Sequence, residues 1–345
     1  MKIHKITENV KQFKPKMKPL KTIEEIPIDT TTLGGSARAR TIITAKIDGE
    51  FDILFHTPEH TYTLNGWGTM RLDYPALNEA REALLRLGSQ TYALKAELYA
   101  VEEDSERPVQ LHKFLSLVKG ENADPERLRL AFWDILNIDW KPVMNTYQDR
   151  LNMLGLWFIG RQYSRVVPYI KPDNHDQVRE FWDIYVEKGG YEGVVAHVGE
   201  TIYKIKPELE VDAVIIALNK TKVWKENKVG SIKVALMTED GRLVELSDVS
   251  IPAKKGLREM AWGFKQYMIS EDANNVWIRP QSVVQILYNE TIPAEKQTWT
   301  FKEGQYIKGE KIEFFSLKHP RLIHFRPDKT VNPTDLRLSQ IGGFL

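Results

Sequence analysis

The sequence predicts an α+β protein made of two domains. At 345 residues the chain is long enough for each domain to bury its own core. Up to residue 218, strand-like alternation is mixed with amphipathic helical patterns, whereas short strands with one helix follow a polar stretch at 219–228. We therefore expect a first domain over 1–218 with a basic N-terminal extension, a linker over 219–228 and a second domain over 229–345.

The first domain is expected to contain antiparallel sheets with flanking helices. Asp48-Gly49 lies between two apolar runs, and Asp-Gly readily supplies the positive φ angles of a primed turn, so this stretch predicts a β-hairpin. Helical patterns cover 75–87, 147–162 and 175–188, the first with a proline in its first turn. Further strands are predicted at 92–101, 128–135, 193–198, 201–206 and 213–218.

The pattern of the second domain indicates a small β-barrel. Short strands are predicted at 230–237, 242–249, 282–289, 311–316 and 321–326, with one amphipathic helix at 255–269. Five short strands with one helix fit a Greek-key barrel of the oligonucleotide-binding kind, the OB fold.

Composition excludes several classes of protein. The chain has no cysteine, which rules out disulfides, thiolate zinc sites and iron–sulfur clusters. No apolar run approaches the length of a membrane span, and the first residues lack the apolar core of a signal peptide. We therefore expect an intracellular protein, cytoplasmic or nucleoid-associated, with no membrane partner.

The formal net charge is only +1, but lysines are concentrated at the N-terminus. Residues 1–21 carry seven lysines against the single acid Glu8, and residues 318–329 are also basic. Such segments favour local phosphate contacts on a near-neutral protein, although lysine-rich ends also serve solubility alone.

Lys46 is the most informative residue of the first domain. It precedes Asp48-Gly49 by two residues and follows a β-rich run. A nucleotidyl-transferring enzyme would hold a lysine nucleophile in this position. A lone Lys-x-Asp-Gly is nevertheless a weak signal, because it also fits an ordinary hairpin.

Further candidate residues follow Lys46 in a fixed order along the chain. Residues two apart on a strand share a face, so Lys95 goes with Glu97 and Lys204 goes with Lys206. The others are Phe132 and Asp134 on an apolar strand, Glu192 before Gly193, and the run from His319 to Lys329. Taken singly, each also fits a solvated sheet face or a core position.

In this order, the motifs resemble the covalent nucleotidyltransferase family, which contains ATP-dependent DNA ligases, RNA ligases and messenger-RNA capping enzymes. The resemblance runs from about residue 38 to residue 329, and the ending His319-Pro-Arg-x-x-x-x-Arg326-x-Asp328-Lys329 is similar to that of compact ATP-dependent DNA ligases. It implies a nucleotidyltransferase (adenylation) domain followed by an OB-fold domain.

The resemblance also implies roles for individual residues. Lys46 would attack the α-phosphate of ATP and form a lysyl–AMP, in a loop that Asp48 shapes. The other implied roles are ATP binding by Thr44 and Ala45, ribose binding by Glu97, adenine stacking by Phe132, binding of Mg²⁺ or Mn²⁺ by Glu192, α-phosphate binding by Lys204 and Lys206, binding of a DNA 5′-phosphate by Arg71, and pyrophosphate binding by Arg326, Asp328 and Lys329.

The function implied is that of a monomeric ATP-dependent DNA ligase acting on nicked double-stranded DNA. An RNA ligase or a capping guanylyltransferase would share the lysyl–nucleotide step, and a non-catalytic nucleic-acid-binding barrel protein is the alternative from another class. One departure is that Phe51 stands where DNA ligases and capping enzymes usually have an arginine. The sequence does not indicate whether replication or repair proteins recruit the chain.

Overall fold

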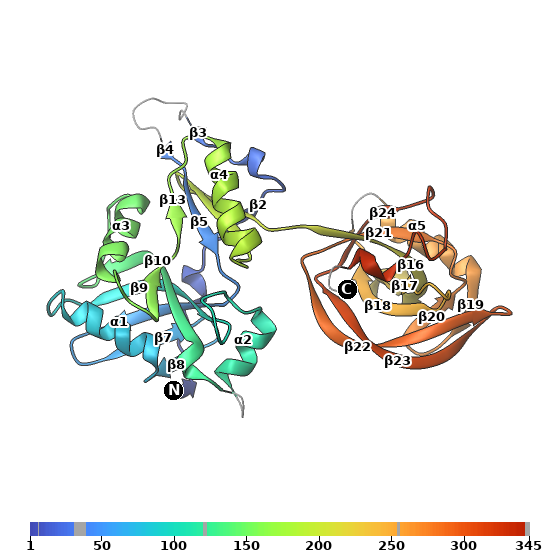
Figure 1. Ribbon diagram of the computed structural model, residues 1–345, viewed down its shortest axis with the longest axis horizontal. Coiled ribbons are helices and arrows are strands. Elements are labelled where there is room, and N and C mark those ends of the chain that lie inside the picture. Colours follow the sequence, from blue (N-terminus) through green and yellow to red (C-terminus); the bar gives the residue numbers. More distant parts are fainter. Residues whose placement is uncertain (6, 31–38, 120–122, 254–255, 342–345) are drawn as a thin grey trace. The chain divides into compact units, whose positions relative to one another are not determined.

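The computed structural model describes residues 1–5, 7–30, 39–119, 123–253 and 256–341. The chain divides into two compact units, Met1–Lys206 and Pro207–Leu345 (Figure 1). Each unit is described by itself.

The first unit contains an eight-stranded and a five-stranded sheet, with a short pair, β3 (Asp29–Thr30) and β4 (Ala39–Arg40). In spatial order, the large sheet consists of β1 (Lys2–Lys5), β8 (Thr69–Leu72), β7 (Thr61–Asn65), β6 (Glu50–His56), β9 (Tyr92–Ala100), β10 (Leu128–Ile138) and β11 (Lys141–Pro142), with β12 (Ser164–Val166) paired to β10. The small sheet consists of β13 (Tyr169–Ile170), β5 (Ile42–Lys46), β14 (Gly193–Val198), β15 (Thr201–Ile205) and β2 (Lys18–Pro19).

Helices flank these sheets, as the sequence predicted. They are α1 (Pro75–Leu85), α2 (Leu111–Val118), α3 (Tyr147–Trp157) and α4 (His175–Trp182), which continues into a π-helical turn, η4 (Asp183–Lys188). Short 3₁₀ turns are η1 (Lys11–Phe13), η2 (Ile23–Glu25) and η3 (Pro125–Arg127). Local chemistry explains the helix starts, because Pro75 occupies the first turn of α1 and the Thr146 hydroxyl caps α3.

The predicted hairpin at Asp48-Gly49 is wrong. β5 and β6 do not pair with each other, since β5 lies between β13 and β14 while β6 lies between β7 and β9. Neither Asp48 nor Gly49 has a positive φ angle. The two residues instead carry the chain from the small sheet to the large one. Gly49 is required there because a Cβ would collide with the Leu98 carbonyl oxygen on β9.

The second unit is a closed ring of five strands. They are β16 (Leu209–Asn219), β17 (Ser231–Met237), β18 (Leu243–Ser250), β24 (Arg321–Phe325) and β21 (Val283–Tyr288), and β21 pairs again with β16. Numbered along the chain, neighbouring strands of the ring follow the order first, second, third, fifth and fourth. The helix α5 (Leu257–Gly263) lies between the third and fourth strands along the chain. This Greek-key arrangement is the predicted OB fold.

The boundary between the units differs from the prediction. The structure places it after Lys206, so β16 belongs to the second unit rather than the first. Ala213 and Ile215 face the barrel core, whereas Val214 and Ile216 lie in a cluster on the other side of the strand. The predicted linker contains η5 (Lys222–Glu226), whose Trp224 packs on Trp262 with ring centroids 4.7 Å apart.

One of the predicted barrel strands belongs instead to a long hairpin outside the ring. Residues 311–316 belong to β23 (Gln305–Lys318), which pairs with β22 (Glu290–Lys302) outside the ring. Its aromatic residues Trp299, Phe301 and Tyr306 cover the outer face of the barrel beside Trp277. The remaining elements are the strands β19 (Met268–Glu271) and β20 (Asn275–Ile278), and the 3₁₀ turns η6 (Phe264–Tyr267) and η7 (Leu338–Gln340).

The predicted helix over 255–269 is shorter, being α5 followed by η6, and residue 255 lies outside the described residues. No helix within the described ranges is long and apolar enough to cross a membrane.

We predict that Gly49→Ala destabilises the first unit by about 1–3 kcal/mol, because the added methyl group must displace the backbone of β9. Urea-induced unfolding of the full chain, followed by tryptophan fluorescence, measures the change. Gly155→Ala is the matched control, since a Cβ in that helical position meets only ordinary contacts at 3.8 Å or more and should be neutral or stabilising. Equal unfolding curves for Gly49→Ala and the wild type would contradict this account.

Candidate functional site

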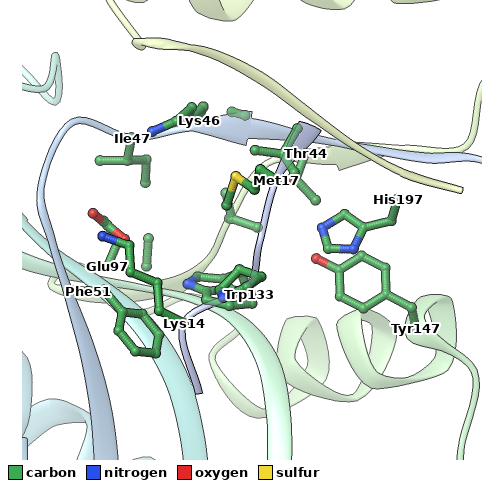
Figure 2. Close-up of a pocket in the computed structure, with 15 residues that line it drawn as sticks. Lys14, Met17, Thr44, Lys46, Ile47, Phe51, Glu97, Trp133, Tyr147 and His197 are labelled. Carbon is green, nitrogen blue, oxygen red and sulfur yellow. The ribbon is translucent and has the colours of Figure 1, made fainter. Parts of the chain in front are cut away.

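A pocket lies between the two sheets of the first unit, with about 560 Å³ of empty space that is open to solvent on one side (Figure 2). The small sheet contributes Thr44, Ala45 and Lys46 from β5, and Val195 and His197 from β14. The large sheet contributes Phe51, Glu97, Ala131 and Trp133. Four predicted site residues, Thr44, Ala45, Lys46 and Glu97, therefore meet in one cavity.

Glu192 holds two lysines at the edge of this pocket. Its two carboxylate oxygens accept hydrogen bonds from the Nζ atoms of Lys46 and Lys206. All three side chains are roughly one-fifth to one-quarter exposed, at 20% for Lys46, 18% for Glu192 and 26% for Lys206. Gly193 fixes Glu192 at the start of β14, because its φ of 151° and the nearby Ile205 carbonyl leave no room for a Cβ.

Strand register places Lys204 on the same face as the pocket. Lys204 on β15 lies opposite Val195 on β14, and Val195 lies opposite Thr44 on β5. Paired residues on neighbouring strands project to the same side of a sheet, and both Val195 and Thr44 line the pocket. One side of the small sheet thus carries the predicted nucleophile Lys46 together with the three residues predicted for phosphate and metal, which are Glu192, Lys204 and Lys206.

Glu97 projects from the opposite wall. It pairs with Phe51 of β6 and is the acidic side chain that lines the pocket. Burial raises the pKa of Glu97 to about 7, while the charges of Lys46 and Lys14 oppose this rise. Asp48 does not line the pocket; its carboxylate accepts a hydrogen bond of 3.0 Å from the backbone N–H of Leu111 and so caps α2.

The aromatic residue in the pocket is Trp133 rather than Phe132. Phe132 is fully buried on the helical side of β10, where its ring stacks on Phe158 with centroids 4.3 Å apart. A β-bulge explains the difference: Phe132 pairs with Ala96 and Asp134 with Lys95, which leaves Trp133 as the extra residue. Bulges re-aim side chains in this way. The Phe132 prediction is therefore corrected by one position.

The inner end of the pocket is formed by two stacked rings that the sequence analysis missed. Tyr147 of α3 and His197 of β14 have ring centroids 3.8 Å apart with planes at 20° (Figure 2). Burial lowers the pKa of His197 to about 4, so this imidazole is neutral near pH 7. His197 could have been found from alternation, since it is two residues beyond Val195 on the same strand.

The structure does not place Arg71 where a phosphate could reach it. Its side chain is only 2% exposed and donates hydrogen bonds to Asp52, at 3.1 Å and 3.3 Å, and to Glu50. Asp52 is next to Phe51 on β6, so Asp52 faces away from the pocket that Phe51 lines. Arg71 thus belongs to a buried ion-pair cluster, and the prediction for this residue is corrected.

The second unit gathers the three terminal motif residues around a fourth, Asp212. Arg326 donates to Asp212 at 3.0 Å and to Asp328 at 2.6 Å, and Lys329 donates to Asp212 at 2.6 Å. The hydrogen bonds from Arg326 lower the pKa of Asp328 to about 2. Sequence reasoning missed Asp212 because it is far from the motif along the chain, at the start of β16.

The N-terminal segment also contributes to the pocket of the first unit. Lys14, Pro15 and Met17 line it from the stretch between η1 and β2. The lysines of this stretch are evident in the sequence, but no local pattern predicts that any of them lies in the site.

The site thus offers a lysine amine beside a carboxylate, an aromatic wall and a neutral histidine. Among the described residues, no group of three or more histidine or acidic side chains is arranged to hold a metal ion. The arrangement suits a flat ring in the interior and phosphates at the lysine-rich edge.

Sequence comparisons find relatives of this chain. A family model described as the ATP dependent DNA ligase domain matches residues 29–209, slightly more than half of the chain. The DNA ligase of Methanococcus maripaludis is 22% identical over 293 residues, which cover 74% of this chain and 48% of the relative. The DNA ligase of Archaeoglobus fulgidus is 25% identical over 260 residues, covering 70% and 44%. The chain spans about half the length of these relatives.

Solved structures show the same fold. Pmar-Lig_PreS3 has a TM-score of 0.58 at 15% identity and is similar over 83% of this chain and 63% of that chain. A structure from an analysis of Lig E DNA ligases has a TM-score of 0.51 at 15% identity, over 90% and 100%. These likenesses confirm the predicted α+β fold, with an adenylation domain followed by an OB-fold domain.

We predict that Glu97→Gln makes stability less dependent on pH. The pKa of Glu97 is raised from 4.5 to about 7 in the folded chain, so between these values the folded chain keeps a proton that the unfolded chain has released. The contribution of this group to stability is therefore full below pH 4.5 and declines as the pH rises to 7. The wild type should lose about 1–3 kcal/mol more unfolding free energy over this interval than the variant.

Urea unfolding at the two ends of the interval measures the difference. Glu82→Gln, at an exposed position of α1, is the control and should behave as the wild type does. An unchanged pH dependence in Glu97→Gln would show that the carboxyl group does not hold the proton.

Proposed function

Because the chain belongs to the family of the ATP dependent DNA ligase domain, we propose that it is an ATP-dependent DNA ligase that seals 5′-phosphate/3′-hydroxyl nicks in double-stranded DNA through a covalent lysyl–AMP. The observation that carries this proposal is the position of Lys46. Lys46 lines the pocket between the two sheets, and its amine donates a hydrogen bond to the Glu192 carboxylate.

The pocket walls suit adenosine. Trp133 offers an aromatic face on one wall and Val195 an apolar contact on the other, so the base would lie between them. Thr44 and the neutral His197 provide polar atoms at the inner end. Glu97 would accept hydrogen bonds from the ribose hydroxyls near the opening.

The first step forms a bond between the Lys46 amine and the α-phosphorus of ATP, and breaks the bond to pyrophosphate. A lysine attacks only as the neutral amine, so its ion pair with Glu192 must open and its proton must leave before attack. Lys204 and Lys206, on the same side of the sheet, would stabilise the charge that develops on the α-phosphate.

Mg²⁺ or Mn²⁺ fits the Glu192 carboxylate. Mg²⁺ is usually bound through one or two carboxylates together with substrate phosphates and waters, rather than by a cage of protein ligands. Glu192 would provide such a carboxylate once its ion pair with Lys46 opens. When bound, the cation neutralises phosphate charge.

The second unit would act on the leaving group. Arg326 and Lys329 are cations grouped around Asp212, and Asp328 orients the Arg326 guanidinium. We assign this cluster to pyrophosphate in the first step. The two later steps are AMP transfer to a DNA 5′-phosphate and attack by the adjacent 3′-hydroxyl. Neither step releases pyrophosphate, so neither should need this cluster.

We predict that Lys46→Ala abolishes covalent labelling by α-labelled ATP, because the substitution removes the amine that is proposed to accept the AMP. The protein is incubated with Mg²⁺ and the nucleotide, denatured, and examined for retained label. Lys188→Ala, an exposed lysine of the same unit, is the control and should label normally. Label that survives Lys46→Ala, or a wild type that takes none, would contradict the proposal.

The labelled protein then distinguishes the related functions. Transfer of AMP to nicked DNA, followed by sealing, supports the DNA ligase. Transfer only to RNA would identify an RNA ligase, for which Phe51 in place of an arginine is the observation in favour. Label from GTP alone would identify a capping guanylyltransferase.

We predict that Trp133→Ala weakens ATP binding about tenfold or more, because base stacking on an aromatic side chain contributes roughly 1–3 kcal/mol. Trp133→Phe should restore most of the affinity. Phe132→Leu is the matched comparison: it should leave ATP affinity unchanged and cost about 1–2 kcal/mol of stability, since Phe132 stacks on Phe158 in the core. Equilibrium binding of ATP and urea unfolding measure the two effects. The opposite pattern would return the base-stacking role to Phe132.

A further inference from the structure

Lys14 extends into the pocket mouth from the N-terminal segment. Figure 2 shows its side chain running past the Phe51 ring towards Glu97. Lys14 makes no ion pair with any of the residues that the structure describes, within 4.0 Å. Its charge nevertheless reaches the pocket, because it is among the groups that oppose the rise in the pKa of Glu97.

The segment that carries Lys14 is fixed on both sides. Before it, β1 pairs with β8, and Val10 is buried to 2% exposure in a cluster with Phe51. After it, β2 pairs in parallel with β15, and the backbone N–H of Leu20 donates to the Lys204 carbonyl at 3.0 Å. The position of Lys14 at the mouth is therefore set by two anchors and is not that of a free tail.

Lys14 borders a second cavity as well. This outer groove adjoins the pocket and is lined by Lys11, Lys14, Phe51, Trp67 and Leu115, among others. Trp67 is 75% exposed, and the Lys11 ammonium lies 5.7 Å from the centre of its ring. Lys14 and Phe51 line both cavities, so they mark the junction between the nucleotide pocket and the groove.

A cation is needed at this junction for the proposed chemistry. The 5′-phosphate of a nick carries about two negative charges. It must approach the phosphorus of lysyl–AMP, whose non-bridging oxygens are also negatively charged. Phe51 cannot supply a cation, and Arg71 is buried against Asp52 and Glu50. In lysyl–AMP the Lys46 nitrogen is bonded to phosphorus, and Lys206 is paired with Glu192.

We propose that Lys14 binds the 5′-phosphate of the nick at the junction of the two cavities, and so supplies the positive charge that Phe51 does not. This inference rests on the proposed ligase function and adds a specificity residue to it. Lys11 and Trp67 in the outer groove lie where the nucleotide that bears this phosphate would follow.

The test uses full-length protein converted to its lysyl–AMP form, and nicked duplexes that end in a 5′-phosphate or a 5′-hydroxyl. Lys14→Ala is compared as lysyl–AMP protein, which separates any effect of the substitution on the nucleotide pocket from its effect on the nick. It should bind the 5′-phosphate nick about tenfold or more weakly, and transfer AMP to it correspondingly slowly, because a charge-assisted phosphate contact is lost. Its binding to the 5′-hydroxyl nick should not change. Lys14→Arg should restore the preference for the phosphate.

Lys16→Ala is the matched control, since Lys16 is an exposed lysine of the same segment that lines neither cavity. If Lys14→Ala prefers the 5′-phosphate nick over the 5′-hydroxyl nick as strongly as the wild type does, the assignment of Lys14 is overturned while the ligase function stands. Loss of lysyl–AMP formation in Lys14→Ala would also overturn it, by placing the cation on the nucleotide. A wild type that forms no lysyl–AMP would instead refute the ligase function itself.

Discussion

The close approach of Gly49 to the Leu98 carbonyl is the constraint on which the site depends. The chain leaves the small sheet at Lys46 and enters the large sheet at Glu50, so only three residues cross between them. A side chain at Gly49 would push the crossing away from β9. Because the crossing is short and tight, Lys46 and Phe51 lie on opposite walls of the same cavity. Asp48 fastens it to α2 through the Leu111 N–H.

The charges of the pocket follow from this two-walled construction. The small sheet presents Lys46, Glu192, Lys204 and Lys206 on one side, where a single carboxylate holds two ammonium groups. The large sheet presents Glu97, whose pKa is raised by burial against the opposing charges of Lys46 and Lys14. The lysines proposed to bind phosphate and the Glu97 carboxylate proposed to bind the ribose thus lie on different sheets. A ligand that spans the cavity would be oriented by both.

Local patterns in the sequence predicted the elements that local interactions determine. The helices near 75–87 and 147–162 and most strands are present, and Thr44, Ala45, Lys46 and Glu97 meet in the pocket. The predictions that were wrong depend on tertiary structure. A bulge places Trp133 rather than Phe132 in the pocket. An apolar run buried on both faces placed β16 in the barrel. Arg71 is paired with acids that lie about twenty residues earlier in the chain.

Phe51 and the N-terminal segment pack against each other, and this contact affects which cation lies at the pocket mouth. Phe51 is 6% exposed and packs with Val10, which is 2% exposed, in a small apolar cluster. An arginine at this position would bring a charge into that cluster, and burying an uncompensated charge is costly. The contact with Val10 helps to hold η1 and therefore Lys14 at the pocket mouth. Phe51 thus stands on β6 in place of a cationic arginine, and it also helps to position the cation Lys14 of the N-terminal segment.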